Sequence, residues 1–199
     1  MSDNNEQPQK ESFLKDVAEH SMNIIRDDGV YRHLVFSNNG SSIYRFEIIT
    51  WPGYLCYTGD MGAFVFTRVQ DMFTFFRNTQ RKINPCYWAE KVVAENKPDG
   101  VEAFSIEKFR NNVLASTRAH LSIEDNEEIP SNVLDEIAPI LEAQDFIDAI
   151  GIIRDFRSDE IDFNDWWEFR NKKYTYAFIW CCYALVWAIE QYDTTHKHF

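Results

Sequence analysis

Asp60, Glu95 and Lys97 together could support metal-dependent hydrolysis. Nucleases of the restriction type combine one carboxylate with a Glu-x-Lys triplet on a neighbouring strand, so that two carboxylates bind Mg²⁺ beside a lysine. Here Glu95-Asn96-Lys97 ends a strand-like segment, and Asp60 lies in an earlier turn. Because 26% of the residues are charged, such a triplet also arises by chance. The alternative is a charged strand end and a plain turn in which Asp60 bonds its own backbone.

A second arrangement with chemical potential is a cysteine–histidine pair. His33 and Cys56 lie in segments that we expect to be adjacent strands, and a neighbouring histidine can activate a thiol as a nucleophile. The alternative is that Cys56, between Leu55 and Tyr57, packs in an apolar core. No two cysteines have a CxxC spacing, so we expect all four to be reduced core thiols in a reducing compartment, and we expect no zinc site. The four cysteines are Cys56, Cys86, Cys181 and Cys182.

Several enzyme classes have sequence signatures that this chain lacks. It has no P-loop, no GxGxxG after a strand, no GxSxG elbow and no HExxH helix. These absences count against nucleotide-cofactor enzymes, serine hydrolases of the elbow type and zincin metalloproteases. We therefore expect no cofactor and no resident metal, and a chain without catalytic activity is favoured over an enzyme.

The net charge of −12 is concentrated in one part of the chain. Residues 121–168 hold fifteen acidic residues and only two basic ones, Arg154 and Arg157, which gives −13. The segments before and after carry −1 and +2. A negative field repels nucleic acid and attracts basic proteins, so we expect a basic protein partner and no direct nucleic-acid binding. The alternative is a solvated surface that keeps the protein soluble.

Trp166 and Trp167 stand inside this acidic segment, between Asp165 and Glu168. Aromatic residues dominate the energetics of protein interfaces, so both are candidate anchors for a partner, with burial in the core as the alternative. The candidate partner-binding site combines these tryptophans with seven carboxylates of the same segment. Its members are Glu124, Asp125, Glu127, Glu128, Asp159, Glu160, Asp162, Trp166 and Trp167.

The first half of the chain has the pattern of antiparallel strands. Residues 1–11 are polar and are expected to form a flexible tail, followed by an amphipathic helix over 12–26. Turn-forming pairs such as Asn39-Gly40 and Pro52-Gly53 separate runs of β-branched and aromatic residues. The predicted strands cover 31–37, 43–51, 54–58, 63–67 and 87–95, and a short helix covers 69–78.

The second half has the pattern of helices. Ser105 is placed to cap a helix, and Ser131 is expected to cap another that Pro139 breaks or kinks. Further helices are predicted over 140–156 and 174–191, with an irregular segment at 159–169 and a flexible tail at 194–199. Strands followed by helices predict an α+β fold: an antiparallel sheet of four to five strands covered by helices. We expect one domain over 12–193, sheet-rich over 30–100 and helical over 104–193.

No membrane segment is expected. Residues 1–10 lack the apolar stretch of a signal peptide. The longest uncharged run, over 174–189, has sixteen residues, fewer than the roughly 20 that cross a bilayer. Because this run is apolar on every side, we expect a helix that other elements surround.

Four short motifs resemble those of a known group of proteins. They are Thr50-Trp51-Pro52-Gly53, Tyr57-Thr58-Gly59-Asp60-Met61-Gly62, Asp71-Met72-Phe73 with Phe75-Phe76-Arg77, and Trp180-Cys181-Cys182-Tyr183-Ala184 with Gln191-Tyr192-Asp193. Together they are similar to uncharacterised proteins of bacteriophages and prophages, over roughly residues 30–193. The resemblance implies a phage or prophage origin and the bacterial host cytoplasm as the place of action. It carries over no catalytic residue, because none is established for that group.

Three functions are compatible with these observations. The first is a phage accessory protein that binds a host protein through its acidic surface. In its most specific form it inhibits a nucleic-acid-binding defence system, of the CRISPR or restriction type, by imitating nucleic acid. The second is a metal-dependent nuclease or nucleotide-acting enzyme that uses Asp60, Glu95 and Lys97. The third is an assembly factor that oligomerises through its aromatic C-terminal half, and the oligomeric state is left open.

Overall fold

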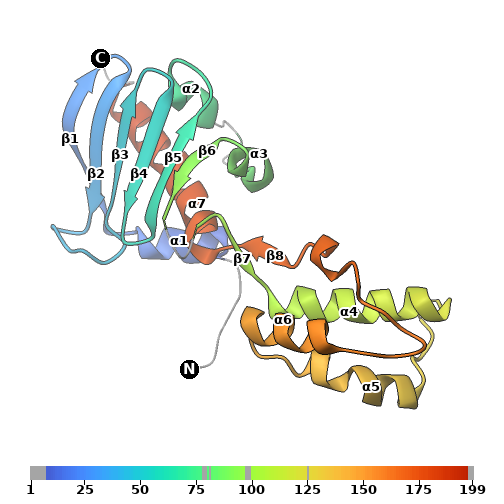
Figure 1. Cartoon of the computed structure of the whole chain (residues 1–199). Helices are drawn as coiled ribbons and strands as arrows, with labels where there is room; N and C mark the ends of the chain where they lie inside the picture. Colours follow the sequence, from blue (N-terminus) through green and yellow to red (C-terminus); the bar gives the residue numbers. More distant parts are fainter. Residues whose placement is uncertain (1–7, 78–79, 81, 97–99, 125, 197–199) are drawn as a thin grey trace. The chain divides into compact units, whose positions relative to one another are not determined.

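Alternating apolar and polar residues in the first half of the chain produce one antiparallel sheet of six strands (Figure 1). The computed structural model describes residues 8–77, 80, 82–96, 100–124 and 126–196. Each strand pairs with the next in chain order: β1 (Ser21–Asp28), β2 (Tyr31–Ser37), β3 (Phe46–Trp51), β4 (Tyr54–Gly59), β5 (Gly62–Thr67) and β6 (Val92–Glu95). The predicted α+β class and antiparallel sheet are confirmed, and the sheet has more strands than the four to five expected.

The other described elements are mainly helices, and the chain forms two compact units. These elements are α1 (Lys10–Asp16), α2 (Met72–Phe76), α3 (Pro85–Ala89), β7 (Glu102–Phe104), α4 (Ile106–Leu121), α5 (Ser131–Leu141), α6 (Phe146–Asp155), η1 (Trp166–Glu168), β8 (Lys172–Tyr174) and α7 (Tyr176–His196). The sheet unit ends at Glu102 and resumes at Tyr174, and the helical unit is 103–173. The helical unit is therefore an insertion between β6 and α7, whereas the sequence predicted a single domain over 12–193.

Two short strands carry the chain out of the sheet unit and back. β7 and β8 pair with each other. The backbone N–H of Ser105 donates to the carbonyl of Asn171 over 2.7 Å, and the N–H of Thr175 donates to the carbonyl of Val101 over 3.0 Å. The two strands are therefore antiparallel, and the insertion begins and ends on hydrogen-bonded neighbouring strands.

Tight turns fix the register of the main sheet. Pro52 and Gly53 join β3 to β4, and Gly53 has a φ of +85°, the positive value that the third residue of a type II turn requires. Gly59 ends β4 where the chain passes close to the β2–β3 loop. A Cβ at this position would lie 2.2 Å from the carbonyl oxygen of Arg45, so a larger residue would displace that loop.

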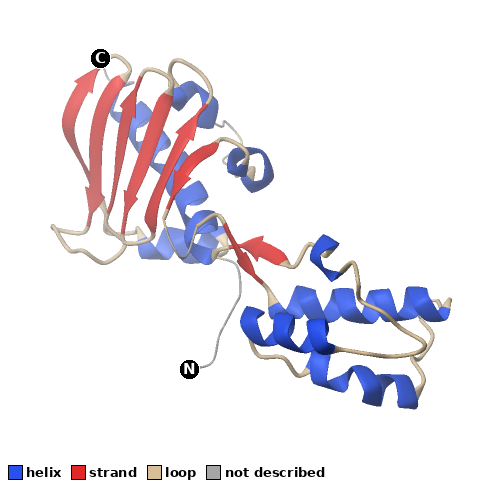
Figure 2. Cartoon of the chain, viewed as in Figure 1, coloured by secondary structure: helices blue, strands red, loops and turns tan. Residues whose placement is uncertain are grey.

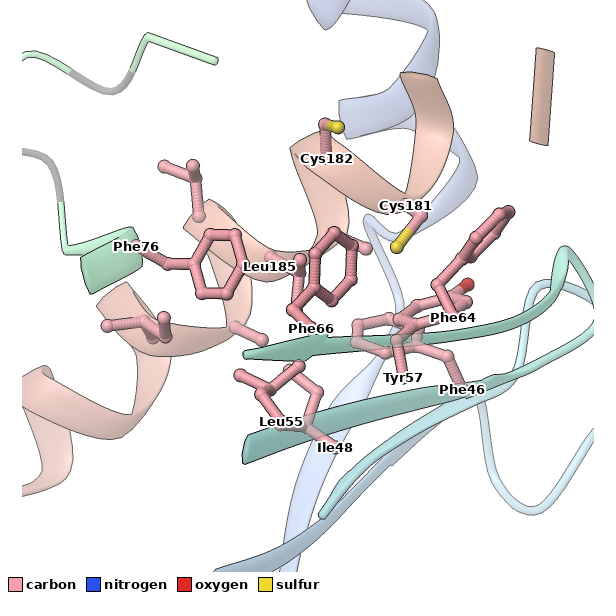
Figure 3. Packing of buried hydrophobic residues seen from close by; sticks show 14 of the residues in the cluster. Phe46, Ile48, Leu55, Tyr57, Phe64, Phe66, Phe76, Cys181, Cys182 and Leu185 are labelled. Atoms are coloured by element: carbon pink, nitrogen blue, oxygen red, sulfur yellow. The ribbon is translucent and has the colours of Figure 1, made fainter. Parts of the chain in front are cut away.

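The inner face of the sheet packs against α7 (Figure 3). Phe46, Tyr57 and Phe64 are fully buried there. Figure 3 shows the Cys181 side chain pointing toward these sheet residues and that of Cys182 pointing away from them. Both thiols are fully buried, and burial raises the pKa of each well above its ordinary value. The expectation of core thiols is therefore confirmed for these two cysteines, whereas it is wrong for Cys86, which is exposed, and Cys56 is only half-buried.

α7 is enclosed because α1 packs on it as well as the sheet. The ring of Phe13 on α1 lies 5.0 Å from that of Trp180, and Phe46 on β3 lies 5.7 Å from the same indole. Eleven residues of α7 are buried, on all sides of the helix, which explains why its sequence is apolar on every side. Among the described residues, no helix combines the length and apolar character needed to cross a membrane.

The N-terminal region differs from the sequence-based expectation. The pattern predicts a helix over 12–26, but α1 ends at Asp16 and Ser21–Asp28 forms the edge strand β1. The pairing of β1 shifts register between Ile24 and Arg26. This irregularity breaks the strict alternation of a strand, so the spacing of the apolar residues imitates a helix.

Other boundaries also differ from those predicted. Residues 87–95 form the last turn of α3 and then β6, instead of one strand. Pro139 lies inside α5, which continues to Leu141, so it does not break the helix there, although it has no N–H to donate to the carbonyl of Asp135. α6 begins at Phe146, because the side chain of Asp145 caps it by accepting from the N–H of Asp148. α7 continues to His196, so residues 194–196 are helical and not a flexible tail.

The buried hydroxyl of Tyr57 provides a test of the sheet core. This residue is fully buried, and its hydroxyl has no hydrogen-bond partner among the described residues. An unpaired buried hydroxyl costs about 1–3 kcal/mol, so Tyr57→Phe is expected to leave the free energy of unfolding unchanged or raise it by about 1 kcal/mol. Urea denaturation measures the difference.

Tyr192 is the matched control for Tyr57. It is also buried, but its hydroxyl donates to Asp27 over 2.8 Å and accepts from Arg32 over 3.4 Å. Tyr192→Phe is therefore expected to lower the free energy of unfolding by about 1–2 kcal/mol. If Tyr57→Phe lowered the free energy of unfolding as much as Tyr192→Phe, the Tyr57 hydroxyl would have a hydrogen-bond partner.

Candidate functional site

The helical unit has a hydrophobic core of its own. α4 begins at the N-cap Ser105, whose hydroxyl accepts from the N–H of Lys108, as predicted. Its buried face carries Phe109, Val113 and Thr117, and the Thr117 hydroxyl donates to the carbonyl of Val113. The core is completed by residues of α5, α6 and the loops: Ile129, Val133, Ile137, Ile140, Ala143, Ala149, Ile153, Ile161 and Phe163. The carboxylates of this unit are therefore placed on a separately packed scaffold.

The first group of candidate carboxylates follows the end of α4. Ser122 ends the helix with a left-handed conformation, at φ +54°, and the chain then turns toward α5. Ile129 is buried and holds this linker to the core, whereas Glu124, Glu127 and Glu128 are exposed. Asp125 lies outside the described residues. The linker is therefore fixed by an apolar residue and presents its acidic side chains to solvent.

The second group lies in the loop that follows α6. Asp159 and Glu160 are exposed, and the exposed Asp162 stands between the buried residues Ile161 and Phe163. Figure 1 shows this loop running to the far end of α4 and turning back there. The imidazole of His120, in the last turn of α4, lies 4.0 Å from the Asp162 carboxylate. Asp162 therefore lies at the C-terminal end of α4, where the linker that carries the first group begins.

Little positive charge balances these carboxylates. Glu124, Glu127, Glu128, Asp159 and Glu160 form no ion pair in the described part of the chain. The C-terminal end of a helix already carries a partial negative charge, so acidic residues that gather there are not stabilised by the helix dipole. Arg118 and His120 in the last turn of α4 are basic residues at this end, and the exposed carboxylates that follow have the same sign as the helix dipole there.

The two tryptophans have different environments. Trp166 is half-buried against the core of the helical unit, and Trp167 is 64% exposed. Both line a pocket of about 430 Å³ with Ile153, Phe156 and Phe163. Asp162 also lines it, so the pocket joins the exposed indole to the acidic loop.

Arginines at this pocket are engaged in structural contacts. Arg157 donates to the carbonyls of Arg154 and Phe156 and so caps the C-terminal end of α6. Arg154 pairs with Asp155 over 3.2 Å. The sequence did not identify this pocket. The alternation of Ile161 and Phe163 with carboxylates is the local signal that points to it.

The residues of the nuclease hypothesis have structural partners. Asp60 accepts from the backbone N–H of Tyr44 over 2.8 Å, in the neighbouring β2–β3 loop and not in its own turn as the structural alternative expected. Glu95 accepts from the N–H of Val101 over 2.6 Å. Lys97 lies outside the described residues. Within the described chain, no three histidine, cysteine or acidic side chains gather as metal ligands would.

The cysteine–histidine pair is not formed. His33 and Cys56 are on β2 and β4, which β3 separates, so the expectation of adjacent strands is wrong. His33 instead pairs with Glu47 over 2.5 Å. Burial raises the pKa of the Cys56 thiol, with a smaller contribution from the charge of Glu47, which is opposite to what an activated nucleophile requires.

Comparisons with known proteins give no family for this chain. No protein-family model, no curated protein and no solved structure matches it. The geometry of the helical unit is therefore the basis for a functional conclusion.

Proposed function

We propose that this chain is a phage- or prophage-encoded binding protein, which uses its helical unit to bind a positively charged host protein in the bacterial cytoplasm. One observation carries the proposal: the exposed Trp167 and the exposed Asp162 line one pocket of the helical unit, and five further carboxylates of the same acidic segment are exposed without an ion pair in the described part of the chain. The carboxylates would attract basic side chains, and the indole with its pocket would supply the desolvated anchor that strong interfaces contain.

The partner class follows from the charge. A protein that handles nucleic acid carries a basic groove, and a surface with exposed carboxylates can occupy that groove in place of phosphates. Inhibition of such a host defence protein is the specific form of the proposal. The resemblance to phage proteins supports this setting, because phages gain from blocking host nucleases.

The test compares two triple charge reversals. In the first, Glu124, Glu127 and Glu128 become lysine; in the control, the exposed Glu11, Glu19 and Glu90 of the sheet unit become lysine. Both variants change the net charge of the chain by the same amount. If the partner binds the acidic linker, only the first variant should lose the capture of a basic protein from bacterial lysate. Capture should also weaken between about 50 and 300 mM salt, as the Debye length shortens. If both variants captured the same amount of the basic protein, the partner would not bind at Glu124, Glu127 and Glu128.

Trp167→Ala tests the anchor separately. With the captured partner purified, we expect the dissociation constant to rise about 30-fold, which corresponds to the roughly 2 kcal/mol typical of an aromatic hot spot. Because Trp167 is exposed, the variant should keep the melting temperature of the wild type. An unchanged dissociation constant would remove Trp167 from the interface.

A further inference from the structure

Among the described residues of the sheet unit, one face of the main sheet carries no helix. Figure 2 shows the helices of the sheet unit on one side of the six strands. On that inner side, residues such as Leu34, Ile48 and Leu55 are fully buried. The alternate residues of each strand point to the opposite, outer face.

The middle of the outer face carries an apolar row, which polar residues such as Arg26, Glu47 and Thr58 flank. The pairing places one row of outward residues across five neighbouring strands: His33, Ile49, Cys56, Val65 and Ala94. Solvated faces of antiparallel sheets are normally polar, so four apolar or weakly polar residues in one row indicate a face that is covered.

An aromatic row lies beside this apolar row. Trp51 and Tyr54 are paired across β3 and β4, and their rings stack at 5.3 Å. Tyr31 on β2 is also outward, and these three side chains are 36–42% exposed. Exposed aromatic residues of this kind are enriched at the centres of protein interfaces.

The charged groups of the outer face neutralise one another. Glu47 binds both Arg45 and His33, and Arg26 pairs with Asp28 over 3.1 Å. A face without surplus charge does not attract a strongly charged partner. It can, however, meet an identical face without placing unpaired like charges opposite each other, as a two-fold interface requires.

The area of the face is sufficient for a dimer. Six strands about 4.8 Å apart, each about six residues long at about 3.4 Å per residue, cover roughly 24 by 20 Å. Two such faces would bury on the order of 1,000 Å², which is the lower limit for a specific interface.

From these observations we infer that the outer face of the sheet binds the same face of a second copy of this chain, so that two sheets pack face to face. This self-association is independent of the partner binding proposed for the helical unit. It also differs from assembly through the C-terminal half, because the aromatic residues of α7 are largely buried inside the sheet unit.

Sedimentation analysis of the full chain tests the inference. The wild type should be a dimer at about 100 μM, well above the micromolar dissociation constants typical of small interfaces. Ile49→Lys, in the middle of the apolar row, should raise the dissociation constant at least 100-fold and give a monomer. Ile43→Lys is the matched control, because Ile43 is 65% exposed in the β2–β3 loop, and it should stay dimeric. A monomeric wild type at this concentration would overturn the inference.

Thiol labelling gives a second measurement, which uses the wild type and so does not require a variant to fold. Cys56 lies in the apolar row, whereas Cys86 on α3 is exposed. On dilution of the wild type from dimer to monomer, Cys56 should react with a thiol reagent at least ten times faster, while Cys86 reacts at a constant rate. A Cys56 rate that does not depend on concentration would overturn the inference.

Discussion

Replacing Asp71 with alanine is expected to lower the free energy of unfolding by about 3–5 kcal/mol, because it leaves the buried guanidinium of Arg32 without a counter-charge. The Arg32 side chain is 9% exposed and donates to both carboxylate oxygens of Asp71, over 2.9 and 3.1 Å. The rings of Phe73 and Tyr192 cover the guanidinium, with centroids at 4.5 and 5.4 Å. Urea denaturation followed by tryptophan fluorescence measures the loss.

Asp71 also caps α2, and this second role can be separated from the first. Its carboxylate accepts from the backbone N–H of Phe73 over 3.0 Å. Asp71→Asn keeps an oxygen for the cap but removes the charge, so its loss should be smaller than that of Asp71→Ala by about 1 kcal/mol.

The matched control is Asp28→Ala. Asp28 also pairs with an arginine, Arg26, but both side chains are more than half exposed. Exposed pairs contribute about 0–1 kcal/mol, so this variant should be close to the wild type. A loss below about 1 kcal/mol for Asp71→Ala would contradict the assignment of a buried pair.

The same pair makes stability depend on pH. Burial raises the pKa of Asp71, but hydrogen bonds from Arg32 and the Phe73 backbone, with the charges of Arg32 and Arg77, outweigh it and lower the pKa. The stabilising contribution is therefore complete above the ordinary aspartate pKa, about 3.9, and is lost as pH falls through the lower folded-state value. Below pH 4 the difference between wild type and Asp71→Ala should shrink.

The sequence predicted the central strands well because their residues alternate strictly and their turns have specific chemistry. β2, β4 and β5 carry large apolar residues at every second position, and Gly53 and Gly59 mark the two ends of β4. The same reasoning failed at β1, where the irregular register hides the alternation. β7 and β8 are three residues each, too short to give any period.

The division into two units could not be predicted from local patterns. α4 and α7 are both helices that follow strands, yet α4 packs with α5 and α6 and α7 packs on the sheet. Periodicity shows that a helix has an apolar face, but it does not show which other element covers that face. The full burial of α7 was foreseeable, since no side of it is polar, but its partner elements were not.

The candidate site was partly predictable. Residue type and charge density indicated the acidic segment and its tryptophans from sequence alone. Sequence could not separate Trp166, which packs on the core, from the exposed Trp167, because adjacent residues in an irregular segment have no period. The sequence also could not predict that Asp162 lies near His120 at the end of α4, because this proximity depends on the path of the loop after α6.

Removing α7 is expected to abolish folding of the sheet unit. Deleting residues 105–171, a longer segment, is expected to leave the sheet unit folded. A chain that ends at Lys173 loses eleven buried residues of α7, among them Trp180 and Leu185, and exposes the inner face of the sheet. Each large apolar side chain contributes about 1.5–3 kcal/mol on burial, so the loss exceeds the 5–15 kcal/mol of total stability of a typical protein. Near-ultraviolet circular dichroism and thermal denaturation should show no cooperative transition for the sheet unit.

The internal deletion removes residues 105–171 and joins Phe104 to Lys172 through Asn-Gly. The hydrogen bonds from Ser105 to Asn171 and from Thr175 to Val101 show that β7 and β8 are antiparallel neighbours, and Asn-Gly favours the two-residue turn of a hairpin. The sheet core contains no residue of the deleted segment, so the shortened chain should unfold cooperatively near the wild-type temperature of the sheet unit. If both deletions unfold the protein, the helical unit is not an independent insertion. If the chain ending at Lys173 still folds cooperatively, α7 is not the element that completes the core.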